Sequence, residues 1–281
     1  MNKMSSIQKF FFSLAIILIL VIVLAPYMWM ISSSFKRDLE IQSSDPSWIP
    51  KEFTLENYVK MNKVVSIARY FKNSVIISSG SMVLAITLSL LAAYGISRFS
   101  FKGREFYSLL LFSTQMLPGV MFLIPYFLIF NYVKKITGFP MVDTHHGLIL
   151  TYTQFALPFS ILMLRNYLDS VPTEIDEQAM IDGCSRVGAL FRVIIPLAKP
   201  GIAAVGIYAF IMGWNEILFA QSLTSNRTAT IALGLLKYLT RDSSAWGSMM
   251  AACFVSSIPI IFLFTVFQKH IVKGLVSGYG K

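Results

Sequence analysis

Residues that bind metals or form covalent crosslinks are scarce in this 281-residue sequence, which has two cysteines and three histidines. Cys184 and Cys253 lie far apart along the chain, so the two thiols lack the spacing of a zinc or redox motif and are not expected to form a structural disulfide. His145 and His146 are adjacent, so they point in different directions on a helix, with only Asp143 near ligand spacing. No metal site is predicted.

Nucleotide-binding and catalytic motifs are also absent. The chain contains no G-x-x-x-x-G-K-[ST] phosphate loop, which excludes ATP binding through that motif, and no G-x-S-x-G nucleophile elbow. We therefore predict no catalytic residues and no enzymatic activity, and we expect no cofactor to bind to this chain.

Charged residues make up only 14% of the sequence, whereas 55% is hydrophobic, which is typical of a multi-span membrane protein. The net charge of +10 would suggest nucleic-acid binding in a soluble protein. Here the basic residues lie between apolar stretches, where they set orientation and meet lipid head groups. Membrane lipid is therefore a predicted partner and nucleic acid is not.

Six apolar stretches are long enough to cross a bilayer core of about 30 Å at about 1.5 Å per residue. They predict spans at residues 10–35, 73–97, 106–133, 144–164, 201–226 and 243–268, within one all-α transmembrane domain over residues 1–281. The first stretch is interpreted as a retained span rather than a signal peptide. The short basic turn RFSFKGRE at 98–105 is predicted to be cytoplasmic. This orientation puts both termini and the 269–281 tail inside, and the 36–72 loop outside.

The most polar long segment in the second half of the chain is the loop at 171–200. Thr173 and Asp176 suggest a weak capping box that starts a helix, and Gly183 ends it. Ser185 is predicted to cap a second helix that ends at Pro196. An apolar ridge at steps of three and four runs through the pair, at Met180, Cys184, Val187, Phe191 and Ile194. The ridge either docks in a groove of a soluble partner or lies on the lipid surface.

Polar residues inside the spans are the candidates for a solute pathway. Gln115 in the third span and Thr151, Thr153 and Gln154 in the fourth either line a shared pathway or pair with each other between helices. Trp214, Asn215 and Glu216 interrupt the fifth span. Glu216 is the only acidic residue well inside any span, and it either contacts solute or serves as a structural or gating element.

Several of these features resemble one family. Glu177, Ala179, Gly183 and Pro196 resemble, in order and spacing, the EAA loop of membrane permease subunits of ATP-binding-cassette importers. Gln178, Val193 and Ile195 depart from that pattern. The AY…RF.F.GR stretch at 93–104, the WNE triplet at 214–216 and the glycine-rich end are similar to maltose-type permeases of the carbohydrate-uptake branch.

The resemblance implies a type I importer permease in a bacterial inner or plasma membrane, with 171–200 as a cytoplasmic coupling loop. It implies that an ATPase is contacted by Glu177, Ala179, Met180, Asp182, Gly183, Phe191 and Pro196. Candidate residues for the solute pathway are Gln115, Gln154, Trp214, Asn215 and Glu216. The implied partners are a second homologous permease, two cytosolic ATPase subunits that bind ATP and Mg, an extracytoplasmic solute-binding protein, and a sugar or oligosaccharide.

Two other functions remain open at this point. A proton-coupled secondary transporter would need titratable groups at mid-membrane in paired, inverted half-repeats, and only Glu216 is present. A membrane assembly factor without transport activity would need none of these features.

Overall fold

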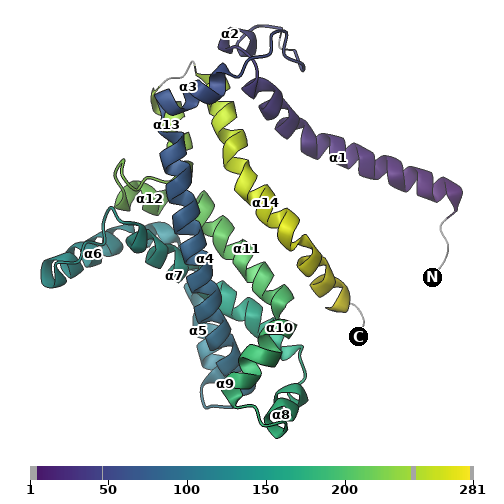
Figure 1. The fold of residues 1–281 in the computed structure, drawn as a ribbon, viewed down its shortest axis with the longest axis vertical. Helices are drawn as coiled ribbons and strands as arrows, with labels where there is room; N and C mark the ends of the chain where they lie inside the picture. The colour runs from purple at the N-terminus through teal and green to yellow at the C-terminus, as the bar shows by residue number, and fades with distance from the viewer. Residues whose placement is uncertain (1–4, 46, 242–244, 279–281) are drawn as a thin grey trace. The chain divides into compact units, whose positions relative to one another are not determined.

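The computed structural model of the chain describes residues 5–45, 47–241 and 245–278, and the regular structure in these ranges is helical (Figure 1). The elements run in the order α1 (Ser6–Ser34), α2 (Asp38–Ile41), α3 (Glu56–Val64), α4 (Ile67–Arg98), α5 (Arg104–Thr114), η1 (Gly119–Phe122), α6 (Leu123–Thr137), α7 (His145–Asp169), α8 (Glu174–Ile181), α9 (Arg186–Ala189), η2 (Leu190–Ile194), α10 (Ile195–Leu197), α11 (Lys199–Asn215), α12 (Leu218–Leu223), α13 (Ile231–Arg241) and α14 (Trp246–Gly278).

Among the described residues, five helices are long and apolar enough to cross a membrane. They are Ile7–Ser34, Ile67–Arg98, Gly119–Thr137, His145–Asp169 and Trp246–Lys269. A sixth span results if the bent pair Arg186–Leu197 and Lys199–Asn215 counts as one. The predicted all-α membrane fold is therefore confirmed.

The predicted span at 106–133 begins too early, because its first part forms the separate helix α5 and the long apolar segment is Gly119–Thr137. Helix α5 ends at Thr114, and Pro118 has an extended backbone (ψ 127°) before the 3-10 turn η1 and helix α6. Proline lacks the N–H that would continue an α-helix, and it disfavours helical backbone in the residue before it. The long apolar third span is chiefly α6 with its preceding turn.

The predicted interruption of the stretch 201–226 at Trp214, Asn215 and Glu216 is present in the structure. Glu216 has an extended backbone (ψ 125°), so α11 ends at Asn215 and α12 is separate. Helix α14 runs to Gly278, so most of the predicted tail at 269–281 is helical, while residues 279–281 lie outside the described ranges. Near the other end of the chain, the predicted outer loop 36–72 contains α2, α3 and the first turns of α4.

The chain packs as two compact units, residues 1–68 with 234–258, and residues 69–233 with 259–281. In the first unit, the Asn57 side-chain amide donates to the carbonyls of Ser34 (2.9 Å) and Lys36 (2.7 Å). The backbone N–H of Gly247 donates to Asp38 Oδ1 at 2.7 Å. These bonds join the end of α1, the segment after it and the start of α14.

The second unit holds the cores that position the 171–200 hairpin, defined here as α8, α9, η2 and α10 with their connections. One apolar cluster combines Leu90 and Ala93 of α4 with Leu164 and Leu168 of α7 and includes Leu190, Ile194 and Ala198 of the hairpin. A second cluster joins α4, α6, α7 and α12 through Ile77, Phe130, Leu148, Tyr152 and Phe219. The hairpin is therefore packed against the helices, with one face inside the core.

Candidate functional site

The 171–200 hairpin has the helix–glycine–helix form predicted from its sequence. Helix α8 ends at Ile181, and Gly183 follows with φ +87°, a left-handed conformation that glycine adopts without steric cost. The backbone N–H of Cys184 donates to Ala179 O at 3.0 Å, which closes the end of α8. The Ser185 hydroxyl then accepts from Gly188 N at 3.1 Å and caps α9.

The predicted capping box at the start of α8 does not form. Thr173 stands at the N-cap position but makes no capping side-chain hydrogen bond there. Asp176 is buried and turned inward, where it pairs with Arg98 of α4. A carboxylate with a guanidinium partner gains more from that ion pair than from a backbone N–H at an exposed helix end.

The second helix ends at Leu197, one residue after the predicted end at Pro196. The chain continues helically from α9 through the π turn η2 and through α10 to Leu197. A π turn widens the helix just before the proline, where the missing N–H of Pro196 would otherwise interrupt the bonding pattern. The direction changes only after Leu197, where the helix ending there meets α11 at 78°.

The outer face of the hairpin carries exposed apolar residues. The exposed fractions are 84% for Ile181, 65% for Val187 and 60% for Phe191. The predicted ridge was partly wrong, because Ile194 is fully buried in the core. Ile181 was missed because it does not share the three-and-four spacing that starts at Met180. Large apolar side chains at this exposure favour burial against another surface, either a partner protein or lipid.

The residues predicted to contact an ATPase differ in their accessibility. Glu177, Asp182, Gly183, Phe191 and Pro196 are exposed, Met180 is half-buried and Ala179 is buried. The side chain of Ala179 therefore lies inside the hairpin and is not offered to a partner. Glu177 lies in the first turn of α8 with Glu174, where carboxylates stabilise a helix N-terminus.

The candidate solute-pathway residues do not come together in one site. Trp214 is buried between Phe71 (ring centroids 5.6 Å apart) and Phe210 (5.4 Å), so it belongs to the core. Glu216 accepts hydrogen bonds from the backbone N–H groups of Phe219 (3.0 and 3.1 Å) and Ala220 (3.2 Å). Its carboxylate therefore covers the first turn of α12, while Asn215 beside it is exposed.

Polar groups of the third and fourth predicted spans mostly satisfy themselves within their own helices. The hydroxyls of Thr151 and Thr153 donate to the carbonyls of Gly147 (2.8 Å) and Ile149 (2.7 Å). Neither predicted alternative, a shared lining or a pairing between helices, describes these two threonines. Gln115 stands at the exposed C-terminal end of α5.

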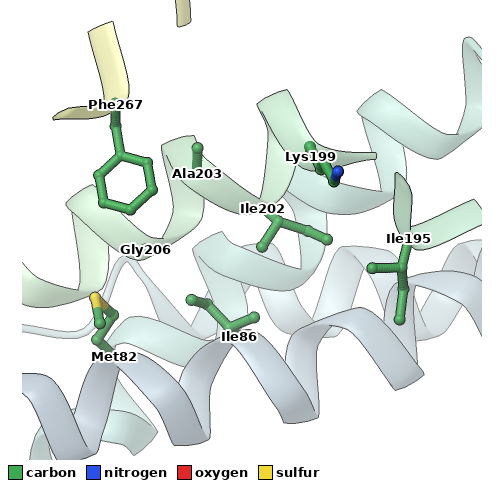
Figure 2. Close-up of a pocket in the computed structure, with 8 residues that line it drawn as sticks. All are labelled: Met82, Ile86, Ile195, Lys199, Ile202, Ala203, Gly206 and Phe267. Atoms are coloured by element: carbon green, nitrogen blue, oxygen red, sulfur yellow. The ribbon is translucent and has the colours of Figure 1, made fainter. Parts of the chain in front are cut away.

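Gln154 lies in a cavity of about 410 Å³, which is otherwise lined by Phe122, Pro125, Tyr126, Ile129, Phe130 and Leu150. A second cavity of about 330 Å³ lies between α4, α10, α11 and α14 (Figure 2). Its lining residues are Met82, Ile86, Ile195, Lys199, Ile202, Ala203, Gly206 and Phe267, of which Lys199 alone is charged. A polar solute would find few hydrogen-bonding groups in this second cavity, and it contains none of the candidate pathway residues.

The two adjacent histidines have separate structural roles. His145 Nε2 lies 2.9 Å from Asn73 Oδ1, and His146 Nε2 lies 2.7 Å from the carbonyl of Pro140. Within the described ranges, no group of three or more His, Cys, Asp or Glu side chains is placed to hold a metal ion.

A family model described as the binding-protein-dependent transport system inner membrane component matches residues 85–277, which include the hairpin and its core. The chain belongs to this family. The inner membrane ABC transporter permease protein YcjP of Escherichia coli (strain K12) is 34% identical over 276 residues, covering 97% of this chain and 96% of that protein. The trehalose/maltose transport system permease protein MalG of Thermococcus litoralis is 35% identical over 266 residues, covering 93% of each.

The fold of a solved bacterial ABC transporter involved in alginate import is also similar, with a TM-score of 0.77 at 21% identity over 96% of this chain and 99% of that one. The prediction of an ATP-binding-cassette importer permease, made from the EAA-like loop, is confirmed by the family match and these relatives. This permease is a multi-pass membrane protein.

Proposed function

We propose that this permease forms one half of the membrane pathway for a sugar or oligosaccharide, and that the hairpin couples it to ATP hydrolysis in separate subunits. The solute class follows from similarity to the trehalose/maltose permease. The partners in this proposal are a second homologous permease, two cytosolic ATPases that bind ATP and Mg, and an extracytoplasmic solute-binding protein. The chain itself binds no nucleotide, and both of its termini are cytoplasmic.

The observation that carries this proposal is that the hairpin has one face buried in the core and another face with exposed apolar residues. Its inner face is buried in the core of α4, α7 and α11, whereas Ile181, Val187 and Phe191 are exposed on its outer face. Burying an apolar side chain of this size stabilises a complex by about 1.5–3 kcal/mol. A partner that covers the exposed residues would thereby hold an element that is continuous with the membrane helices.

Reconstitution of the permease with its partners in liposomes tests this function. We expect ATP hydrolysis that rises when sugar-loaded solute-binding protein is added, and sugar uptake that requires ATP. Uptake driven by a pH gradient without ATP would instead identify a secondary transporter. Absence of both uptake and stimulated hydrolysis would indicate a protein without transport activity.

Crosslinking from the hairpin tests the docking part separately. Ser185 is exposed beside Gly183, and a Ser185→Cys variant in a Cys184→Ser, Cys253→Ser background has one thiol in the described ranges. We expect a crosslink to an ATPase subunit. A cysteine at Leu39, which is 86% exposed in the outer segment, provides the control that should not crosslink to it. Labelling of position 185 from the outside would contradict the proposed orientation.

Growth of a deletion strain on a panel of sugars, oligosaccharides and glycerol phosphates tests the solute class. Loss of growth on one or a few carbohydrates, restored by the wild-type gene, is the expected result. A growth defect limited to non-carbohydrate solutes would contradict the carbohydrate assignment while leaving the importer function intact.

A further inference from the structure

A single buried cluster joins α8 of the hairpin to two membrane helices. Arg98, the last residue of α4, has its Nε 2.7 Å from Asp176 Oδ2 in α8. Its two terminal nitrogens donate to the carbonyls of Leu168 and Val171, at 3.1 Å each, where α7 ends. One turn earlier on α4, the Tyr94 hydroxyl donates to Asp176 Oδ1 at 3.1 Å. We call Tyr94, Arg98 and Asp176, with those two carbonyls, the Arg98 cluster.

The ion pair in the Arg98 cluster is almost completely removed from water. Only 5% of the Arg98 side chain and 10% of the Asp176 side chain are exposed. A buried pair of this kind is little screened by salt, and its planar guanidinium fixes the directions of several bonds at once. Burial is tolerated here because Asp176 has two partners and the guanidinium contacts four oxygen atoms, those of Asp176, Ser97, Leu168 and Val171.

The position of the Arg98 cluster gives it a mechanical role. Helix α8 lies at the end of α4 where α5 begins (Figure 1), and a short turn at residues 170–173 connects it to α7. The apolar contacts of the hairpin with the core are non-directional, so they resist separation more than sliding. The hydrogen bonds from Arg98 to the two α7 carbonyls and from Tyr94 to Asp176 resist both, because hydrogen bonds weaken steeply as their angles change.

We propose that Arg98 is a positioning residue for transport: it transmits displacement of α8 to α4 and α7 through Asp176 and the carbonyls of Leu168 and Val171. This inference rests on the proposed function, because it takes the partner that moves α8 to be the ATPase. It adds a residue outside the hairpin, 73 positions before Val171 along the chain, to the path between ATP hydrolysis and the membrane helices.

Three variants test the role of the cluster. Arg98→Gln and Asp176→Asn each leave one buried charge without its partner, which destabilises a structure whatever its function. The double variant Arg98→Met, Asp176→Leu removes both charges and keeps an apolar filling, so a purely structural ion pair should be replaceable in this way. An ion pair that transmits motion should not be replaceable in this way, because the double variant also lacks the hydrogen bonds from Arg98 to α7.

A matched control is available on the same side of the second unit. Arg165 of α7 pairs with Glu105 of α5 at 3.1 Å and with Asp169 of α7 at 3.4 Å. Neither of these partners lies in the hairpin. Arg165→Gln therefore removes two ion pairs, one from α7 to α5 and one within α7. We expect this variant to retain coupling.

The readout is the ratio of ATP hydrolysis with sugar-loaded solute-binding protein to hydrolysis without it, measured on purified complexes whose subunit content is checked. We expect the double variant to assemble and to lose this stimulation by about fivefold or more, the lower range for a coupling free energy. Arg98→Lys, which keeps the charge but not the fork of donors, should be intermediate. Normal stimulation in the double variant would overturn the inference.

Two further outcomes separate this inference from the proposed function. If wild-type complexes show no stimulation by the loaded binding protein, the proposed function fails before the variants are compared. If the wild type is stimulated but the double variant does not assemble with the ATPases, the cluster is required for folding of the hairpin. That outcome also overturns a role specific to transmission.

Discussion

The ring of Tyr167 in α7 lies directly against the backbone of Gly201 in α11. A Cβ added at Gly201 would lie 2.8 Å from Tyr167 Cγ and 3.2 Å from Tyr167 Cβ. The Tyr167 hydroxyl donates to the carbonyl of Leu197 at 3.2 Å, so the ring is held at both ends and cannot easily move aside. The chain therefore enters α11 through a contact that admits only glycine.

Gly201→Val should destabilise the packing of α7 on α11 by about 1–3 kcal/mol, the range for overpacked cores. Thermal unfolding in detergent, followed by the loss of monodisperse protein, measures this change. Gly95→Ala is the control, because Gly95 lies inside α4 with no other atom within 4 Å of a built Cβ. Helix propensity predicts a small gain in stability there. Equal stability of both variants would contradict the close packing.

Gly183→Ala should impair coupling through backbone strain and not through a clash. Nothing lies within 4 Å of a Cβ built at Gly183, but its φ of +87° costs other residues about 1–2 kcal/mol. Asparagine adopts positive φ more readily than alanine, so Gly183→Asn should lose less of the stimulated ATP hydrolysis than Gly183→Ala. Gly183→Asp should uncouple transport while the protein still inserts. Equal activity of the alanine and asparagine variants would show that the conformation is not limiting.

Glu177→Lys should abolish uptake while the permease still inserts and folds. Glu174 provides a close control, because it lies in the same exposed first turn of α8 and has the same relation to the helix dipole. A lysine at either position destabilises the helix similarly, so a larger loss of uptake in Glu177→Lys reports a contact with the partner. Normal uptake in Glu177→Lys would remove Glu177 from the docking surface.

Glu216→Gln should retain most of the uptake activity, whereas Glu216→Ala should lose it. The carboxylate accepts hydrogen bonds from the backbone of Phe219 and Ala220, and a glutamine oxygen can accept them too. Removing the acceptor leaves partly buried N–H groups unpaired, at a cost of about 1–3 kcal/mol. Equal loss in both variants, measured as sugar uptake at saturating ATP, would instead show that the negative charge itself acts on the solute.

The stability of the loop around Asp143 should fall in acid. Partial burial alone would raise the pKa of Asp143, but hydrogen bonds from Ser225 and Thr228, with the charge of Arg227, hold that pKa below its usual value. A lowered pKa stabilises the folded state above the unfolded pKa of about 3.9, and this contribution is lost as pH falls through the folded pKa. Thermal unfolding of the wild type should therefore approach that of Asp143→Asn below about pH 4. Parallel curves would contradict this network.

Local signals in the sequence predicted four of the long apolar helices and the turn of the hairpin. They did not predict the contacts between distant segments. Long apolar runs predicted α1, α4, α7 and α14, and Gly183 with Ser185 predicted the turn of the hairpin. The break at Glu216 was predicted from the WNE triplet, but the start of the third span was placed too early, because an uncharged run has the same composition whether it forms one helix or two. The role of Asp176 depends on Arg98, 78 residues earlier, and local capping rules do not consider such a partner.

The bend after Leu197 has a geometric consequence for any stroke delivered to the hairpin. The helix that ends at Leu197 and the helix that begins at Lys199 meet at 78°, with Ala198 buried at the corner. Because the two helices meet near a right angle, a displacement along the axis of the first would move the second sideways. If a partner moves the hairpin, this single corner at Ala198 would turn that motion toward α11.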